Sequence, residues 1–420
     1  MGTRIFRDAA LEAPATRPVK TYPFFKLDGS VDLLLILVLI AFIVYGLLMV
    51  YSASTDYSWW WYDSAFSQFH RQIIWMVLGI VVAAVAAFVD YHNWHKLALP
   101  ALLGTLVFLL IVLFINKTGT SETNVFTRAF FNGSIQPSEL AKAMTIIYLA
   151  VWINSKREIL HQVSWGLAPL IIIIGLVGGV ILAQPDYSAA LTVVILGGML
   201  FFLGGGEWKQ IGLVLVGGTI LAIFVVGISS TGKARFSDYL AGLVDLTKAS
   251  EHLVYSFQAI VKGGWFGVGF GRSSMKLLGL PFAPTDSIFA VIAEELGLFG
   301  VFGTVALYGL LVWRGLRIAN RAPDLLGSLL ASSLTLWIGF EALMNMLVMV
   351  GLLPFAGNAL PFISYGGSSL LTTMGAVGIL MNVSRHYQPE TDKEEWRSFG
   401  ASADLRGRNR RRSLSRISRP

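Results

Sequence analysis

The chain has 420 residues, of which 55% are hydrophobic and 14% are charged. Soluble domains carry about 25% charged residues, so this composition indicates an integral membrane protein. The absence of cysteine excludes disulfides, thiolate catalysis and cysteine-ligated metals, and the six histidines lack the spacing of a metal site, so no metal-ligating residues are predicted.

Apolar runs long enough to cross a bilayer recur along the chain after residues 1–30, which we expect to form a flexible polar tail. The expected helices are 31–53, 72–89, 97–115, 138–154, 166–182, 188–203, 211–229, 287–313, 326–350 and 366–383. We therefore predict an all-α fold of ten transmembrane helices within residues 31–385, followed by a basic tail at 386–420. Residues 230–284 are predicted to form a large extracytoplasmic loop between helices seven and eight.

The distribution of Lys and Arg predicts how the helices are oriented in the membrane. An even number of helices puts both termini on one side, and most of the 32 Lys and Arg residues fall on that side. The positive-inside rule then places both termini in the cytoplasm. The segment Arg406–Arg419 is interpreted either as a basic segment facing anionic lipid or as a solvated tail that only sets topology. Because the excess charge lies in this tail, nucleic-acid binding is not predicted.

The first part of the chain contains one charged pair inside an apolar run. Glu139 and Lys142 stand three residues apart at the start of the fourth helix, a spacing that puts carboxylate and ammonium on one face. Such a pair either only positions the helix or belongs to a functional cavity, since charges at membrane depth are costly. The earlier loop 54–71 contains Trp59–Trp61, a run typical of an interfacial aromatic belt.

Three outer loops carry further candidate residues. Gln184-Pro185-Asp186 is either a hairpin corner between helices five and six or the source of a carboxylate, Asp186, on the outer face. Arg128, in the loop before the fourth helix, is either solvated or a clamp for a phosphate group. The glycine-rich run Lys262–Gly271 resembles a nucleotide loop only weakly, because no strand precedes it. It is also interpreted as a close-packed loop, with Arg272 and Lys276 adding positive charge behind it.

The stretch Pro281–Gly297 delivers an acid, Asp286, to the start of an apolar helix, with Glu294 and Glu295 two turns deeper. We expect the two glutamates to pair or pack inside the bundle. Asp286 lies at the outer end, near the cations named above, and is predicted to be a general base that deprotonates a sugar hydroxyl of a lipid-linked phosphate substrate. A helix N-terminus lowers the pKa of such a carboxyl, whereas burial raises it.

These residues resemble the SEDS family (shape, elongation, division and sporulation), whose members include FtsW and RodA. The resemblance covers roughly residues 31–385 and rests on the order and spacing of several motifs. They are Val50–Ser54, Gln136–Lys142, Gln184–Asp186, Gly267–Gly271, Thr285–Gly297 and Leu360–Ser369. The ending Met381–Arg385 favours the division-type branch over the elongation-type branch.

The resemblance implies a peptidoglycan glycosyltransferase of the bacterial cytoplasmic membrane that polymerises lipid II into glycan strands on the outer face. Asp286 would activate the 4-hydroxyl of the acceptor sugar, which attacks the anomeric carbon of the growing strand and releases the lipid pyrophosphate. Candidate substrate-binding residues are Glu139, Lys142, Arg128, Asp186, Gln184, Lys276, Arg272, Ser364 and Ser368. A divalent cation, Mg or Mn, would screen the pyrophosphate, but the sequence shows no carboxylate cluster dedicated to it.

The resemblance also implies partners: a class B penicillin-binding protein, which is a transpeptidase, other division or elongation proteins, and membrane lipid.

The sequence departs from the family pattern P-E-x-H-T-D-F, because Phe282, Pro284 and Ser287 replace its Glu, His and Phe. Other departures are Met275, Gly357-Asn358-Ala359 and the Ala129-Phe130 pair after Arg128. Three alternative functions remain open: a lipid II flippase, a non-catalytic division scaffold and an ion-coupled transporter.

Overall fold

The computed structural model describes residues 32–62, 66–118, 136–160, 162–207 and 227–386, together with 209–210, 212–214 and 216–218. In these ranges every regular element is a helix. The α-helices are α1 (Leu33–Tyr62), α2 (Ser67–Phe88), α3 (Trp94–Thr118), α4 (Pro137–Ser155), α5 (Ala168–Ala183), α6 (Tyr187–Leu203), α8 (Ser230–Val244), α9 (Glu251–Gly263), α10 (Met275–Leu278), α11 (Ile288–Asn320), α12 (Leu325–Met349) and α13 (Gly367–Arg385). Short turns of 3-10 helix (Tyr91–Asn93, Arg157–Ile159 and Leu246–Lys248) and one π-helical turn (Val163–Leu167) adjoin them.

Among the described residues, 6 helices are long and apolar enough to cross a membrane. They lie at Leu33–Thr55, Ser67–Phe88, Tyr91–Ile115, Val163–Ala183, Ile288–Asn320 and Leu325–Met349. α6 is apolar but shorter, with 17 residues, and α4 and α13 have 19 residues each but bury polar side chains. The expectation of an all-helical, multi-pass membrane protein is therefore confirmed, whereas the number ten stays a prediction.

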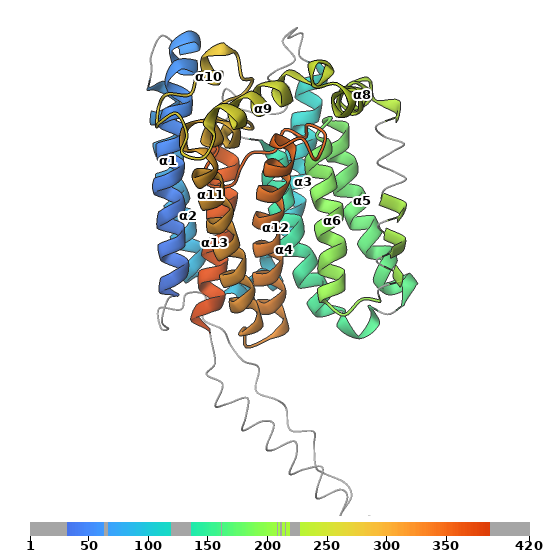
Figure 1. Ribbon diagram of the computed structural model, residues 1–420. Coiled ribbons are helices and arrows are strands. Elements are labelled where there is room, and N and C mark those ends of the chain that lie inside the picture. The colour runs from blue at the N-terminus through green and yellow to red at the C-terminus, as the bar shows by residue number, and fades with distance from the viewer. Residues whose placement is uncertain are drawn as a thin grey trace, which may run out of the picture.

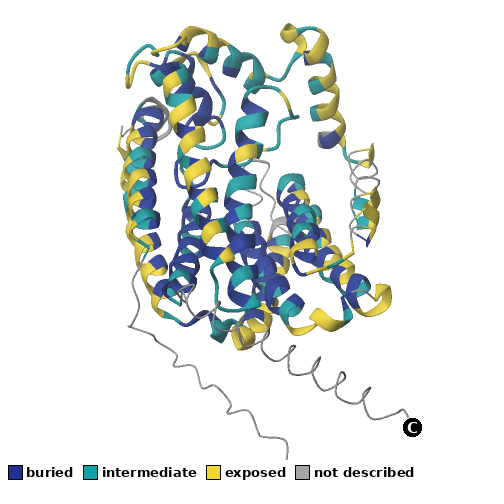
Figure 2. Cartoon of the chain, turned by 60° about the horizontal axis from the view of Figure 1, so that its bottom comes forward, coloured by how far each residue is buried: buried dark blue, intermediate teal, exposed yellow. Residues whose placement is uncertain are grey.

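The outward faces of the helices are apolar. On α1, Leu37 and Val44 are 54% and 53% exposed, and on α2 Ile74 and Val77 are 59% and 56% exposed. Figure 2 shows such exposed residues along the periphery and the buried residues inside. Large apolar side chains at this exposure on several helices mark a surface that contacts lipid rather than water.

The helices stand side by side, and α8, α9 and α10 lie across one end of the bundle (Figure 1). The first turn of α1 and the last turn of α13 lie at the opposite end. α12 is the central element: 72% of its apolar window is buried, against 39% or less in the other candidate spans. It packs against α11, α4 and α13, and it also contacts α9, so it connects the middle of the bundle with the α8–α10 end.

Most expected helices agree with observed ones to within a few residues, and two differences are informative. The expected loop 54–71 is wrong, because α1 continues to Tyr62 and α2 already begins at Ser67. The apolar run ends near Ala53, but a helix satisfies its own backbone and need not stop where its sequence becomes polar. The second difference is that the segment 230–284, predicted to be a large extracytoplasmic loop, contains three helices that were not predicted, α8, α9 and α10. Most of the expected helix 211–229 lies outside the described residues.

α11 is broken at Gly297, and the glycine-rich run fills the break. Gly297 has φ +65°, and a Cβ there would lie 2.5 Å from both Gly267 N and Trp265 O. Around the break, Val268 N donates to Glu294 O at 2.9 Å, and Leu298 N donates to Gly264 O at 2.9 Å. The interpretation as a close-packed loop is therefore right: glycine is needed where two backbones touch, and the carbonyls freed by the break are satisfied there.

Gly297→Ala is expected to lower the thermal stability of the protein. A left-handed conformation costs an alanine about 1–2 kcal/mol, and the added Cβ also overlaps the backbone of the glycine run. The midpoint of thermal unfolding in detergent, followed by size-exclusion fluorescence, measures the effect. Gly303→Ala on the same helix is the control, because a Cβ there meets nothing within 4 Å. Equal midpoints for the two variants would contradict this account of the break.

Candidate functional site

Asp286 lies at the α8–α10 end of the bundle, in the loop 281–287 that leads into α11. This segment is called the Asp286 loop below. The residue is partly buried, and its backbone oxygen accepts a hydrogen bond from Asn345 Nδ2 at 2.8 Å. Among the described residues, nothing donates a hydrogen bond to its carboxylate. Asp286 is thus fixed through its main chain, while its side chain is left available for chemistry.

The segment 357–365 holds the Asp286 loop from the other side. Ser364 Oγ donates to Thr285 O at 2.6 Å, and Tyr365 N donates to Pro284 O at 2.8 Å. A Cβ on Gly357 would come within 3.5 Å of Asp286 Oδ2, so this segment passes directly beside the carboxylate. The side chain of Ser364, expected to bind substrate, therefore donates to the backbone next to Asp286, and it also accepts from Leu360 N at 2.7 Å.

The surroundings of Asp286 favour its neutral form more than water does. Burial raises the pKa of its carboxyl to about 6, the charge of Asp186 adds to the rise, and the guanidinium of Arg235 opposes it. A carboxyl with this pKa is mostly ionised at neutral pH, yet takes up a proton more readily than an ordinary aspartate. That balance is the one a general base needs.

Asp186 joins three helices near this end. Its Oδ2 accepts from Gln136 Nε2 and from Ser138 Oγ, both at 2.8 Å, and its Oδ1 accepts from Ala189 N at 3.2 Å at the start of α6. Ser368 Oγ accepts from Gln136 N at 3.0 Å, which brings α13 to the same point. Asp186 is both a hairpin corner and a neighbour of Asp286, so the two interpretations of this residue are compatible.

Gln184, the other expected residue of that turn, is buried. Its Nε2 donates to Leu109 O of α3 at 2.8 Å. The observed role of Gln184 is to join the turn to α3.

The Glu139–Lys142 pair has a third member, Glu341 of α12. Lys142 is 3% exposed, and its Nζ donates to Glu139 Oε1 at 2.9 Å and also to Glu341 Oε1. The second oxygen of Glu139 is buried without a partner among the described residues. Glu341 was missed in the sequence, although an acid inside an apolar run was the available signal. One turn further along α12 lies Asn345, which links this buried triad to the Asp286 loop.

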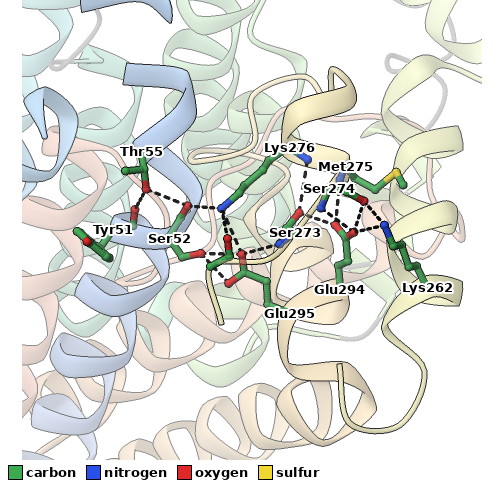
Figure 3. A network of polar contacts seen from close by, with 11 residues as sticks. Tyr51, Ser52, Thr55, Lys262, Ser273, Ser274, Met275, Lys276, Glu294 and Glu295 are labelled. Carbon is green, nitrogen blue, oxygen red and sulfur yellow. Dashed lines mark hydrogen bonds and ion pairs between the residues drawn. The ribbon is translucent and has the colours of Figure 1, made fainter. Parts of the chain in front are cut away.

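The two deeper acids of α11 are packed inside, as expected (Figure 3). Glu294 accepts from Ser274 N at 2.9 Å and from Met275 N at 3.2 Å, and Lys262 Nζ lies 3.7 Å away. Glu295 accepts from Ser52 Oγ of α1 at 2.6 Å. These contacts tie the glycine-rich run and α1 to the start of α11.

The predicted cations do not gather around Asp286 in the way the sequence suggested. Lys276 is buried in the cluster of Figure 3, where its Nζ lies 3.5 Å from Glu295 Oε1 and donates to Ser52 O at 2.9 Å. Arg272 is exposed beside Gly269, and Arg128 lies outside the described residues. Among the described residues, the cation whose charge acts on Asp286 is Arg235 of α8, which the sequence analysis did not single out in the predicted loop 230–284.

In the part of the chain that the structure describes, no group of three or more His, Cys, Asp or Glu side chains is placed to hold a metal ion. The expected divalent cation therefore stays a prediction, with no ligand set assigned to it within these residues.

Comparison with known proteins places this arrangement in a family. Residues 32–389 match the family model of FtsW, RodA and SpoVE, which is described as "cell cycle protein". The chain is 36% identical over 357 residues to a probable peptidoglycan glycosyltransferase FtsW of Geobacter sp. (strain M18), covering 84% of this chain and 96% of the relative. It is 34% identical over 363 residues to stage V sporulation protein E of Bacillus subtilis (strain 168), covering 85% and 98%.

Solved structures give the same result. A chain from a structure titled "Structural coordination of polymerization and crosslinking by a peptidoglycan synthase complex" superposes with a TM-score of 0.70 at 28% identity, covering 86% of this chain and 99% of that one. The rod shape determining protein RodA of Thermus thermophilus superposes with a TM-score of 0.63 at 27% identity, with the same coverage of 86% and 99%.

Proposed function

This chain belongs to the FtsW, RodA and SpoVE family of cell cycle proteins, and we propose that it polymerises lipid II into glycan strands with Asp286 as the general base. Its relatives named FtsW are described as probable peptidoglycan glycosyltransferases, and this activity is the one that the site supports best. The observation that carries the assignment of the base is the partly buried carboxylate of Asp286, which accepts no hydrogen bond from the described residues and is held through its backbone by Asn345.

In the proposed reaction, Asp286 accepts the proton of the acceptor sugar hydroxyl. The hydroxyl oxygen then forms a bond to the anomeric carbon of the growing strand, and the bond between that carbon and the pyrophosphate oxygen breaks. The lipid pyrophosphate leaves with the electron pair of that bond. A base whose pKa lies near the working pH combines a usable ionised fraction with a real affinity for the proton.

Substrate contacts are assigned within the same proposal. Glu139 and Lys142 belong to the buried triad, Asp186 and Ser368 both contact Gln136 at the start of α4, and the positive charge of Arg235 acts on Asp286. Lys142 already contacts two carboxyl groups, so its positive charge is compensated and the triad suits hydroxyl and amide groups better than phosphate. Arg272 and Arg128 remain the candidate residues for the pyrophosphate.

Orientation and partner follow from the family and from charge. Asp286 lies at the end opposite the start of α1 and the end of α13, beyond which the chain is rich in Lys and Arg. By the positive-inside rule this supports an outward-facing site in the bacterial cytoplasmic membrane. Because both ends lie on one side, the number of spanning helices is even, as in the ten that we propose. One similar structure is that of a peptidoglycan synthase complex in which polymerization and crosslinking are coordinated, which supports a penicillin-binding protein as partner.

The direct test is strand formation from labelled lipid II by the purified full chain in liposomes, with and without a cognate transpeptidase. Glycan polymer in either condition is the expected result. Lipid II transfer across the bilayer without any polymer would overturn the proposal in favour of a flippase. Transpeptidase binding with neither activity would overturn it in favour of a scaffold.

The pH dependence of the rate tests the base itself. Asp286 works ionised, so the rate is expected to fall as the pH drops through about 6, the pKa to which burial raises this carboxyl. Arg235→Gln removes the charge that holds this pKa down, so the inflection is expected to move to higher pH. Lys233→Gln, an exposed charge change on the same helix, is the control. An inflection that stays in place in Arg235→Gln would contradict the assignment.

A further inference from the structure

A cavity of about 280 Å³ lies beside the Asp286 loop, between α8, α9 and the end of α12. Its lining residues are Arg235, Asp238, Tyr239, Ser250, His252, Leu253, Phe282, Val348, Met349, Leu353 and Phe355. We call it the stack cavity, because a stack of planar side chains forms one of its walls. None of the residues that hold Asp286 by its backbone lines it, so it is a separate compartment next to the proposed base.

The lining combines polar groups from α8 and α9 with apolar side chains from α9, α12 and the loops. Arg235 and Asp238 offset each other's charge. His252 is neutral, because burial and the nearby Arg235 lower its pKa to about 4. A cavity without net charge offers little to a phosphate or an acidic peptide, and polar groups along one side are unfavourable to a lipid chain. The lining fits a neutral molecule with apolar faces and a hydroxyl-bearing rim, which describes a sugar ring.

One wall of the cavity is a stack of four planar groups drawn from four segments. The guanidinium of Arg235 lies 5.4 Å from the ring centre of Phe355, and its Nη1 donates to Phe355 O at 3.5 Å. The rings of Phe355 and His252 lie 3.9 Å apart at 16°, and those of His252 and Phe282 lie 5.8 Å apart at 5°. The stack joins α8, α9, the 351–365 loop and the Asp286 loop into one rigid surface.

Phe282 shows that this surface stabilises the Asp286 loop in a strained form. Its φ of 51° is unusual for a residue with a bulky side chain and costs of order 1–3 kcal/mol. The stacking contact with His252 offsets part of that cost. A strained aromatic residue four positions before the proposed base is the kind of outlier that accompanies ligand sites.

A hydrogen-bond chain fixes the tautomer of His252. Ser287 Oγ donates its one proton to Pro281 O at 2.8 Å, so it accepts from His252 Nδ1, which lies 3.2 Å away. The neutral ring therefore carries its proton on Nδ1, and Nε2 is an acceptor. Ser287 directly follows Asp286, so His252 is joined by a hydrogen bond to the residue next to the proposed base.

We propose that the stack cavity is a subsite for one neutral sugar ring of the glycan substrate, next to Asp286. The proposal rests on the glycosyltransferase function given above. The cavity walls exclude water from one side of that ring, and the rigid stack sets its position relative to the base. The ring belongs either to the acceptor lipid II or to the end of the growing strand.

Filling the cavity tests the proposal. Ser250 lines it, and no described residue is hydrogen-bonded to its side chain, so Ser250→Phe adds a ring without breaking a contact. Ser237→Phe makes the same change at an exposed position of α8 that does not line the cavity. Ser250→Phe is expected to raise the KM for substrate about tenfold or more with little change in kcat, and Ser237→Phe to leave both unchanged.

Two assays show whether the sugar ring in the subsite belongs to lipid II or to the end of the growing strand. Extension of a preformed strand is measured at varied lipid II, then at varied strand. A raised KM for lipid II assigns the subsite to the acceptor, and a raised KM for the strand assigns it to the donor end. Unchanged KM values in both assays, with wild-type thermal stability, overturn the proposal while the wild-type polymerase activity, and hence the proposed function, still stands.

A second variant keeps the test decisive if Ser250→Phe does not fold. Asp238→Asn changes an exposed lining carboxylate that accepts no hydrogen bond from the described residues. It is expected to raise the same KM about fivefold by removing an acceptor for sugar hydroxyls. The soluble disaccharide peptide, without its lipid, is expected to inhibit the wild type competitively and this variant more weakly. Equal inhibition and equal KM in Asp238→Asn and wild type would overturn the proposal.

Discussion

Asp286→Asn is expected to abolish glycan-strand formation from lipid II while leaving the protein folded. Loss of a general base costs typically about 10²–10⁴ in rate. The amide has nearly the same shape as the carboxylate, and the hydrogen bond from Asn345 to the backbone oxygen is untouched. Because the carboxylate accepts no hydrogen bond from the described residues, its removal breaks no observed contact. Thermal stability should therefore remain at the wild-type level.

The measurement is the initial rate of polymerisation in liposomes, with the amount of folded protein set by size-exclusion chromatography. Glu251→Gln is the matched control, because it neutralises an exposed acid at the start of α9, at the same end of the bundle. The control should polymerise at the wild-type rate. A folded Asp286→Asn protein that does the same would remove Asp286 from the reaction, although family membership would be unaffected.

The sequence was a good guide to the membrane helices, because a run of about 20 apolar residues has no other common explanation. It also separated Asp286 from Glu294 and Glu295 by depth, and the structure places the two glutamates in buried networks. Local spacing predicted the contact of Glu139 with Lys142 correctly, since a helix puts residues three apart on one face. These predictions were correct because each depends on a pattern within one short segment of the sequence.

What the sequence did not reveal depends on contacts between distant segments. Glu341 meets Lys142 across 199 residues, and Asn345 reaches Asp286 across 59. Arg235 and His252 belong to α8 and α9, which are too polar to be detected as spanning helices. Periodicity along one segment carries no information about which other segment it faces.

The departures from the family pattern around Asp286 acquire physical roles in the structure. Phe282 stacks on His252, and Ser287 accepts the hydrogen bond of the same imidazole. Both substituted positions therefore contact one residue of α9. This explains how a loop that lacks the usual neighbours of the acid still holds a defined shape.

Lys142→Met is expected to cause the largest loss of stability of any single change considered. It leaves Glu139 and Glu341 buried in the bundle without the cation that both contact. Removing one partner of a buried ion pair typically costs about 3–5 kcal/mol, because an uncompensated charge remains. Here two carboxylates lose the same partner and repel each other. The expected result is a poorly folded protein with a strongly lowered unfolding midpoint and no polymerase activity.

A triple variant separates the structural from the chemical role of Lys142. Glu139→Gln and Glu341→Gln, added to Lys142→Met, leave no charge in the triad, and neutral replacement of buried ion pairs is often tolerated. Stability should recover in the triple variant, whereas polymerisation should not if the triad contacts substrate. Lys233→Met, at an exposed position of α8, controls for the loss of a lysine and should behave as wild type. Wild-type stability of Lys142→Met would show that the triad does not hold α4 against α12. Recovery of polymerase activity in the triple variant would show that Lys142 has a structural role only.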